Sequence, residues 1–446
     1  MFEHPLTRRH LIHVGSLGGV GLTLPGLLAA GARAKPHLKA TADACIVIFL
    51  NGGPSHLDMW DMKPQAATSI RGEFAPVSSA LPGFEVCEHL PEMAKQAGKL
   101  TVVRSMHHGV NNAHAAAVYA SLTGHDRGEI GGGARPTDYP CPGSVVAMRR
   151  PVRADTVSHV CLPYITREGA QGPPQPGFFG GFLGRAHDPL FVLKDPNATD
   201  FAIPELTLQT DISAQRLDVR RQLFEQLDQT ANQLGAASMS RFQTRALDLL
   251  ASQRAQTAFR VSDEAESVRT RYGRNTYGQS VLLARRLVEA GTRLVTVSWA
   301  PHANATWDTH GSNFKSLKST LLPQFDRACS SLLDDLQQRG LLERTLVAVL
   351  GDFGRTPKIN ANNAGRDHWN YCYSLVLAGG GIQAGLVYGA SDRIGGYPAR
   401  NALEPGDIIS TIYAALGIPH DSEIHDQLGR PYRLVPTGDV VHDLLA

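Results

Sequence analysis

The amino-acid sequence predicts an α/β protein in which a mainly parallel sheet lies between two layers of helices. Two observations carry this prediction. Short, uninterrupted apolar segments that end at glycine or polar residues recur along the chain, as is typical of strands buried on both faces of a parallel sheet. Amphipathic helical segments precede several of them, and strands that alternate with helices favour a three-layer α/β/α sandwich.

Five apolar segments are expected to form strands: residues 45–50, 100–103, 294–297, 346–350 and 375–378. Two amphipathic segments, residues 279–290 and 321–338, precede the third and the fourth of these strands. The second amphipathic segment carries apolar side chains along one helical face, namely Leu322, Phe325, Cys329, Leu332, Leu333 and Leu336. We therefore expect both segments to be helices that pack on the sheet.

The middle of the chain follows a different pattern. Residues 140–176 are rich in proline and glycine, which is typical of loops. Residues 213–272 are charged and carry leucine residues at helical spacing, which indicates a helical insertion and not an independent domain. We expect residues 35–446 to form one α/β domain with this insertion at about residues 213–272.

The first residues indicate an export signal. Arg8 and Arg9 precede a glycine- and leucine-rich apolar stretch over residues 14–30, and Ala32-Arg33-Ala34 provides an A-x-A cleavage pattern. These features predict a signal peptide over residues 1–34, and the paired arginines favour the twin-arginine pathway. The expected location is the periplasm or the cell surface, with the twin-arginine translocase as a partner during export. The alternative is an N-terminal membrane anchor, but the stretch is short for a stable span, so none is expected in the mature form.

Composition and charge exclude some classes of partner. The formal net charge is only +2, and no basic block with interleaved aromatic residues occurs, so nucleic acid is not an expected partner. The six cysteines are scattered without a C-x-x-C pair, which argues against a zinc ribbon or a disulfide framework. Cys45 and Cys329 lie in apolar patterns and are expected to be core thiols.

Ligands of parallel α/β sheets bind at the carboxyl ends of the strands, so polar residues that follow the expected strands are the candidates for chemistry. The carboxylates and imidazoles that stand out are Asp58, Asp61, Asp308, His310, Asp352 and His368. Four histidines between His107 and His125 follow the second strand, and Arg355 follows the fourth. Each has a structural alternative, such as a solvated turn, a core histidine or an Arg–Asp pair that braces a loop.

Together the six carboxylates and imidazoles are predicted to bind one or two divalent metal ions. A mixed set of carboxylates and imidazoles suits zinc, manganese or iron, whereas carboxylates alone suit calcium or magnesium. A pair of metal ions polarises a phosphoryl or sulfuryl oxygen and generates a nucleophile at neutral pH. The fork-shaped guanidinium of Arg355 is predicted to grip an oxyanion during such a reaction.

Several motifs carry a resemblance to a known family. They are Gly52-Gly53-Pro54-Ser55-His56 with Asp58 and Asp61, Trp307-Asp308-Thr309-His310, Asp352-Phe353-Gly354-Arg355-Thr356-Pro357, Gly365-Arg366-Asp367-His368-Trp369 and Gly379-Gly380-Gly381. The chain resembles the bacterial family called domain of unknown function 1501, a sulfatase-like relative in the alkaline-phosphatase superfamily. Residues 405–413 are similar to the closing helix of sulfatases. The resemblance implies an alkaline-phosphatase-like fold over nearly the whole mature chain. It also implies that Asp352 and His368 bind metal beside the pair Asp308 and His310.

The chain departs from the wider superfamily at several positions. Sulfatases and phosphatases usually place an aspartate where this chain has Asn51, and commonly a histidine where it has Phe353. Their Cys-x-Pro-Ser-Arg nucleophile signature is absent, and the equivalent spacing before Thr123 falls on His114. His114 is therefore a second catalytic candidate, while Ser105 and Thr123 stay open as alternative nucleophiles. An oxidised-cysteine mechanism is not expected.

These features predict an exported, metal-dependent hydrolase of sulfate or phosphate esters that acts on a small-molecule or polysaccharide substrate. The alternative is a non-catalytic exported binding module that keeps the fold, for example for sulfated glycans, because no nucleophile is singled out. A phosphoglycerate-mutase-like isomerase fits less well with export, because its phosphorylated substrates are cytoplasmic.

Overall fold

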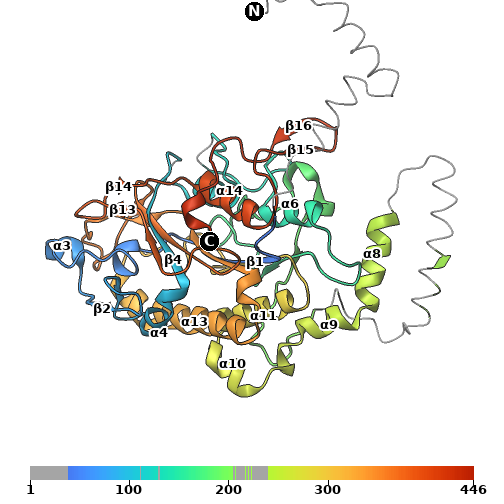
Figure 1. The fold of residues 1–446 in the computed structure, drawn as a ribbon, viewed down its shortest axis with the longest axis horizontal. Coiled ribbons are helices and arrows are strands. Elements are labelled where there is room, and N and C mark those ends of the chain that lie inside the picture. Colours follow the sequence, from blue (N-terminus) through green and yellow to red (C-terminus); the bar gives the residue numbers. More distant parts are fainter. Residues whose placement is uncertain are drawn as a thin grey trace, which may run out of the picture. The chain divides into compact units, whose positions relative to one another are not determined.

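The computed structural model describes residues 39–110, 112–128, 131–203 and 240–446, with a few isolated positions between 206 and 223 (Figure 1). The signal peptide expected over residues 1–34 lies outside the described residues, as does most of the expected insertion before residue 240. Residues Ala40–Ala446 form one unit. None of the helices in the described ranges is both long and apolar enough to cross a bilayer.

An eight-stranded sheet is the centre of the fold. Its strands, in spatial order, are β12 (Leu386–Tyr388), β4 (Leu100–Met106), β11 (Tyr373–Ala378), β8 (Thr345–Gly351), β1 (Ala44–Leu50), β7 (Leu294–Ser298), β5 (His159–Leu162) and β6 (Leu190–Phe191). All five expected segments belong to this sheet. β11 runs antiparallel to both β4 and β8, whereas the other neighbouring pairs are parallel. The expectation of a mainly parallel sheet is thus confirmed.

β1 lies inside the sheet because its side chains are apolar on both faces. All seven of its residues are buried, and it pairs in parallel with β8 on one side and β7 on the other. Successive side chains of a strand point to opposite faces. Two hydrophobic cores therefore receive alternate residues of β1, with Ile46, Ile48 and Leu50 in one and Cys45, Val47 and Phe49 in the other.

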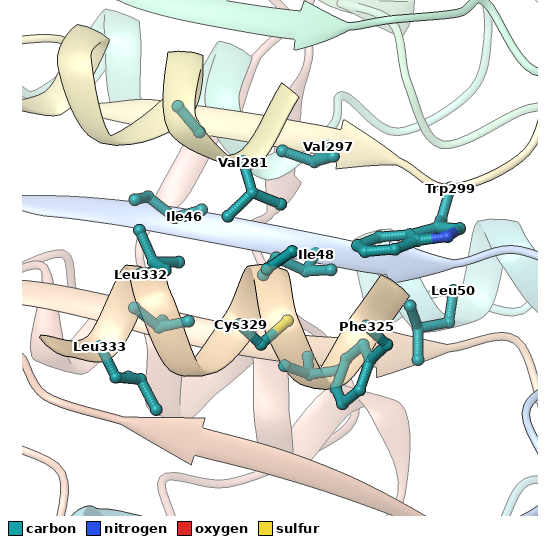
Figure 2. Packing of buried hydrophobic residues seen from close by; sticks show 14 of the residues in the cluster. Ile46, Ile48, Leu50, Val281, Val297, Trp299, Phe325, Cys329, Leu332 and Leu333 are labelled. Carbon is teal, nitrogen blue, oxygen red and sulfur yellow. The ribbon is translucent and has the colours of Figure 1, made fainter. Parts of the chain in front are cut away.

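Helices cover both faces of the sheet. Figure 2 shows α11 (Thr276–Glu289) and α13 (Leu322–Gln338) packed over the side chains of Ile46 and Ile48, with the predicted apolar face of α13 turned towards β1. The same core contains residues of α4 (Pro91–Gln96), α9 (Gln253–Phe259) and α10 (Glu266–Tyr272). The opposite core contains residues of α5 (His114–Thr123), α6 (Pro142–Arg149) and α14 (Pro405–Ala415). The three-layer α/β/α sandwich is therefore confirmed.

Shorter elements complete the described fold. Four two-stranded ribbons pair β2 (Pro76–Ser78) with β3 (Glu85–Cys87), β9 (Gly354–Arg355) with β10 (His368–Trp369), β13 (Ala390–Ser391) with β14 (Pro398–Arg400), and β15 (Glu423–His425) with β16 (Pro431–Arg433). The remaining α-helices of the described ranges are α3 (Thr68–Arg71), α8 (Ser240–Ala251) and α12 (Asn313–Ser316). α8, α9 and α10 lie within the described part of the expected helical insertion. All six cysteines are buried and free.

His159 of β5 makes the fold sensitive to acid. Its ring is buried, and burial lowers its pKa to about 3. The unfolded chain binds a proton at this residue below about pH 6.5 and the folded chain does not, so stability falls as the pH drops through this range.

A His159→Leu variant lacks the titrating ring. Between pH 7 and pH 5 we expect it to lose about 2 kcal/mol less free energy of unfolding than the wild type. Urea unfolding at the two pH values measures the difference, and equal losses would contradict the assignment.

Candidate metal centre

The candidate ligands lie beyond the carboxyl ends of strands that run in the same direction. His114 is the first residue of α5, which follows β4. Asp308 and His310 lie in the loop after β7, and Asp352 directly follows β8. His368 belongs to β10, which pairs with β9 shortly after Asp352. The topology thus brings residues that are distant in the sequence to one edge of the sheet, as expected for a ligand site of an α/β fold.

Two imidazoles and one carboxylate converge at this edge. Nε2 of His368 lies 3.1 Å and Nε2 of His310 3.2 Å from Oδ1 of Asp308, and the two nitrogens lie 2.9 Å apart. Nε2 of His114 lies 3.7 Å from Oδ2 of the same aspartate. Donor atoms of His114, Asp308 and His368 all lie within 4.8 Å of one another, a spacing that can hold a metal ion. We call His114, Asp308, His310 and His368 the metal cluster.

Each histidine of the metal cluster is anchored through Nδ1 to an oxygen atom. The three pairs are His114 with Oδ2 of Asp352 at 2.6 Å, His310 with Oδ1 of Asp367 at 2.8 Å, and His368 with the carbonyl oxygen of Asn112 at 2.7 Å. Such acceptors favour the proton on Nδ1 and leave the lone pair of Nε2 for a metal. Nε2 of His310 and Nε2 of His368 lie 2.9 Å apart, at hydrogen-bond distance, so either a proton on one ring or a metal ion can be shared between them.

Burial and unpaired atoms also fit a bound ion. His114 and Asp352 are 4% and 0% exposed, yet Nε2 of His114 and Oδ1 of Asp352 have no hydrogen-bond partner in the described chain. Buried polar atoms in native proteins are nearly always paired, so these two atoms are candidates to bind a ligand. Imidazoles with one carboxylate suit zinc, manganese or iron better than calcium or magnesium, which prefer oxygen ligands. The side chain of His310 is 43% exposed and leaves the centre accessible to solvent.

The electrostatics of the centre stabilise positive charge. Burial alone would raise the pKa of Asp308, but the neighbouring side chains of His114, His368 and Arg355 hold it well below its usual range. Burial alone would lower the pKa of His114, but the charges of Asp352 and Asp308 outweigh it and raise the pKa to about 9. Burial lowers the pKa of His368. The carboxylates therefore favour a cation at this position, whether a proton or a metal ion.

The contacts of Arg355 differ from those expected of a side chain that grips a substrate oxyanion. Its side chain is fully buried, and its nitrogens donate to the carbonyl oxygens of Gly52, Gly53, Trp307 and Arg366. Nη2 also donates to Oδ1 of Asp308 at 2.7 Å. Because every nitrogen already donates to an oxygen of the protein, the guanidinium positions Asp308 and does not face a substrate.

Asp58 and Asp61, which were expected to bind metal, lie outside the metal cluster. Both oxygens of Asp58 pair with the buried guanidinium of Arg366, at 2.8 and 2.9 Å. Asp58 also accepts hydrogen bonds from Ser55 and Asn313. The partners of Asp61 are Lys63, Arg104 and Ser391. Cations, hydroxyls and an amide thus satisfy both carboxylates. Asp352, the remaining expected ligand, contacts the metal cluster through His114.

The backbone around Asp308 is tightly constrained. Thr306 has a φ of 52°, a left-handed conformation that is unfavourable for a β-branched residue, and its hydroxyl donates to the carbonyl oxygen of Trp299 at 2.8 Å. Gly52 has a φ of 109°, and a Cβ at this position would lie 2.5 Å from the backbone nitrogen of Asp308. Strained backbone held by its surroundings is typical of functional sites, and here it fixes the position of Asp308.

The alternative nucleophiles donate their hydroxyl protons to backbone oxygens. Ser105 donates to Asn401 at 2.5 Å, and Thr123 donates to Tyr119 at 2.6 Å. Neither hydroxyl forms a hydrogen bond with a described member of the metal cluster. His114, in contrast, directs an unpaired Nε2 towards it. Of the residues considered for catalysis, His114 is therefore the one whose reactive atom lies at the centre.

Two residues that anchor the cluster belong to segments noted in the sequence but were not assigned this role. Asp367 stands next to His368, and a carboxylate beside an expected ligand is a signal that could have indicated it. Asn112 contributes its backbone carbonyl to His368, and a backbone contact of this kind leaves no trace in the residue type.

Two substitutions separate structural roles from metal binding. Asp58→Asn leaves the buried charge of Arg366 without its carboxylate, so we expect a loss of about 3 to 5 kcal/mol in free energy of unfolding and an unchanged metal content.

His310→Ala removes a half-exposed cluster residue, so we expect lost metal and a stability close to that of the metal-free wild type. Thermal unfolding and elemental analysis measure the two quantities. Metal lost from folded Asp58→Asn, or retained by His310→Ala, would contradict the assignment.

The chain is similar to several solved structures. PsFucS1 sulfatase from Pseudoalteromonas sp. is 12% identical, with 87% of this chain and 70% of that chain covered and a TM-score of 0.38. A protein in the alkaline phosphatase superfamily from Vibrio parahaemolyticus is 11% identical, with 92% and 72% covered and a TM-score of 0.39. The lipoteichoic acid synthase LtaP from Listeria monocytogenes is 9% identical, with 90% and 78% covered and a TM-score of 0.39.

No curated protein matches the sequence. The family described as protein of unknown function, DUF1501, matches residues 42–445. This match spans nearly all of the α/β domain and includes every residue of the metal cluster. The chain therefore belongs to the DUF1501 family, as its motifs indicated.

Proposed function

We propose that this protein is a metal-dependent hydrolase of sulfate or phosphate esters. The observation that carries the proposal is the convergence of two anchored imidazoles, His310 and His368, on one oxygen of Asp308, with separations of 2.9 to 3.2 Å. Mixed nitrogen and oxygen donors of this kind suit one zinc, manganese or iron ion. A bound divalent ion would polarise an ester oxygen and favour the ionisation of water.

The side chains around the ion have distinct roles in this proposal. Asp308, His310 and His368 hold the ion, and Arg355 positions Asp308 through the 2.7 Å contact. His114 is placed to hold or deliver a proton at Nε2, because Asp352 fixes its ring through Nδ1 at 2.6 Å. A carboxylate that orients an imidazole in this way is a recurring support for proton transfer. Asp352 is therefore proposed as a positioning residue.

One observation favours a second candidate, a binding module that keeps the metal site without turnover. The guanidinium of Arg355 is saturated by oxygens of the protein, so it offers no charge to the leaving group or the oxyanion. A protein that binds esters through the ion alone would need no such group. The binding module and the hydrolase differ in turnover, which the following experiment measures.

The hydrolase is tested with zinc- or manganese-loaded mature protein and three chromogenic substrates: an aryl sulfate, a phosphomonoester and a phosphodiester. We expect turnover of at least one, its loss on chelation and its return when metal is added. His114→Gln, assayed with saturating metal, should lose about 100-fold or more in kcat, whereas His310→Ala should lose both the metal and the turnover. His107→Ala, a histidine outside the cluster, is the matched control and should behave as the wild type. Bound metal without turnover of any substrate would favour the binding module.

We also propose that the protein is exported by the twin-arginine route. Arg8 and Arg9 before a mild apolar stretch support this route, because paired arginines are its recognition signal. In a bacterial host that expresses the full chain, the wild type should reach the periplasm. An Arg8→Lys, Arg9→Lys double variant should remain in the cytoplasm with an uncleaved N-terminus. Cell fractionation measures the location of each protein, and mass spectrometry measures the cleavage of its N-terminus. Equal export of the two proteins would exclude the route.

A further inference from the structure

Three aromatic side chains form an exposed patch near the metal cluster. Tyr371 and Tyr397 are 45% and 52% exposed, and Trp369 is half-buried. The ring centroids lie 4.9 Å apart for Trp369 and Tyr371, 5.8 Å for Trp369 and Tyr397, and 5.6 Å for the two tyrosines. We call these three residues the aromatic patch. Exposed aromatic side chains that gather in one place are a mark of binding surfaces, whereas scattered ones are not.

The backbone holds the aromatic patch in position. Nε1 of Trp369 donates to the carbonyl oxygen of Gly396 at 2.7 Å. The intervening Asn370 is buried and donates to the carbonyl oxygens of His108 and Val110. The turn before Tyr397 is closed by Asp392, whose backbone N–H donates to the carbonyl oxygen of Tyr397 at 2.8 Å. A ligand that binds to the patch therefore orders little new structure, which favours affinity.

The chemistry of the patch matches a sugar ring. Trp369 meets the two tyrosines at interplanar angles of 69° and 68°, so its ring does not stack face to face on either of them. Aromatic faces carry partial negative charge and attract the C–H groups on the face of a pyranose, while tyrosine hydroxyls and the sugar's own hydroxyls remain hydrated.

The position of the patch indicates an extended ligand. Trp369 follows His368 in β10, and successive side chains of a strand point to opposite faces. The side chains of His368 and Trp369 thus point to opposite faces of the β9–β10 ribbon, so a ligand that contacts both must extend around the ribbon. In the β13–β14 hairpin, Arg393 and Arg400 are exposed and Asp392 is the one acidic residue. The net positive charge of the hairpin therefore suits an anionic polymer.

We propose that the aromatic patch binds a sugar ring of a sulfated polysaccharide while an ester on a neighbouring sugar reaches the metal cluster. The assignment of the ester to the cluster rests on the proposed function. The binding of the polysaccharide rests on the patch alone. The patch is thus a specificity-determining subsite that distinguishes polymeric esters from small ones.

The binding is tested by affinity electrophoresis of the metal-loaded mature protein in gels that contain dextran sulfate, at physiological ionic strength. A Tyr371→Ala, Tyr397→Ala double variant should bind about tenfold more weakly than the wild type. Leu428→Ala is the matched control, because it also removes an exposed apolar side chain, 78% exposed, at another site. Equal retardation of the wild type and the double variant, or no retardation of the wild type, would overturn the inference.

Kinetics separates this inference from the proposed function. If the protein is a sulfatase, the double variant should raise KM for sulfate release from dextran sulfate about tenfold and leave kcat unchanged. Its KM for a small aryl sulfate should not change. Retardation that depends on the patch, together with no hydrolysis of any ester, would support the subsite and refute the hydrolase. An equal rise of KM for both substrates would overturn the subsite.

Discussion

The buried guanidinium of Arg355 connects the loops that follow three strands of the sheet. Its acceptors are the carbonyl oxygens of Gly52 and Gly53 after β1, Trp307 after β7, Arg366 before β10, and the carboxylate of Asp308. A charge removed from water is strongly unfavourable unless its partners are all in place. The loops can therefore not shift separately without leaving this charge uncompensated. The relative positions of the cluster residues depend on that constraint.

Arg366 adds a second buried guanidinium close by in the sequence. It pairs with Asp58 and donates to the carbonyl oxygens of Thr356, Pro357 and Ile70. Each of the two arginines pairs with one aspartate near the carboxyl edge. Asp58 neutralises Arg366 and accepts hydrogen bonds from it with both oxygens. Asp308 neutralises Arg355 through one oxygen and also contacts histidines. A carboxylate near this edge is thus a candidate ligand only where its oxygens also face imidazoles.

The positions of the central strands could be predicted from the sequence because these strands are apolar on both faces. The segment expected at 346–350 differs from β8 (Thr345–Gly351) by one residue at each end. The direction of β11 could not be predicted, because an apolar segment has the same pattern in parallel and antiparallel pairing. β5, β6 and β12 were missed because they are short, and β5 lies in a segment whose prolines and glycines indicated loops.

The candidate site was predicted in part for the same reason. Positions after strand ends indicated Asp308, His310 and His368, and the sheet brings them together. The roles of Arg355 and Asp58 could not be predicted, since the sequence does not show which buried oxygens a guanidinium will meet after folding. His114 stood out as one of four histidines after the second strand and through its spacing before Thr123, which matches that of the absent nucleophile signature. Its contact with Asp352 joins residues 238 positions apart in the chain, a separation over which spacing carries no information.

The long separations within the metal cluster have a consequence for metal selection. His368 meets Asp308 across 60 positions and Asn112 across 256, so the unfolded chain presents no comparable arrangement of donors. The unfolded chain does not bind an ion in this geometry, because the chelating arrangement exists only once the sheet and its loops have assembled. The ion is then chosen from the pool that surrounds the finished fold. If the chain is exported in the folded state, as proposed, its metal would come from the compartment in which it folds.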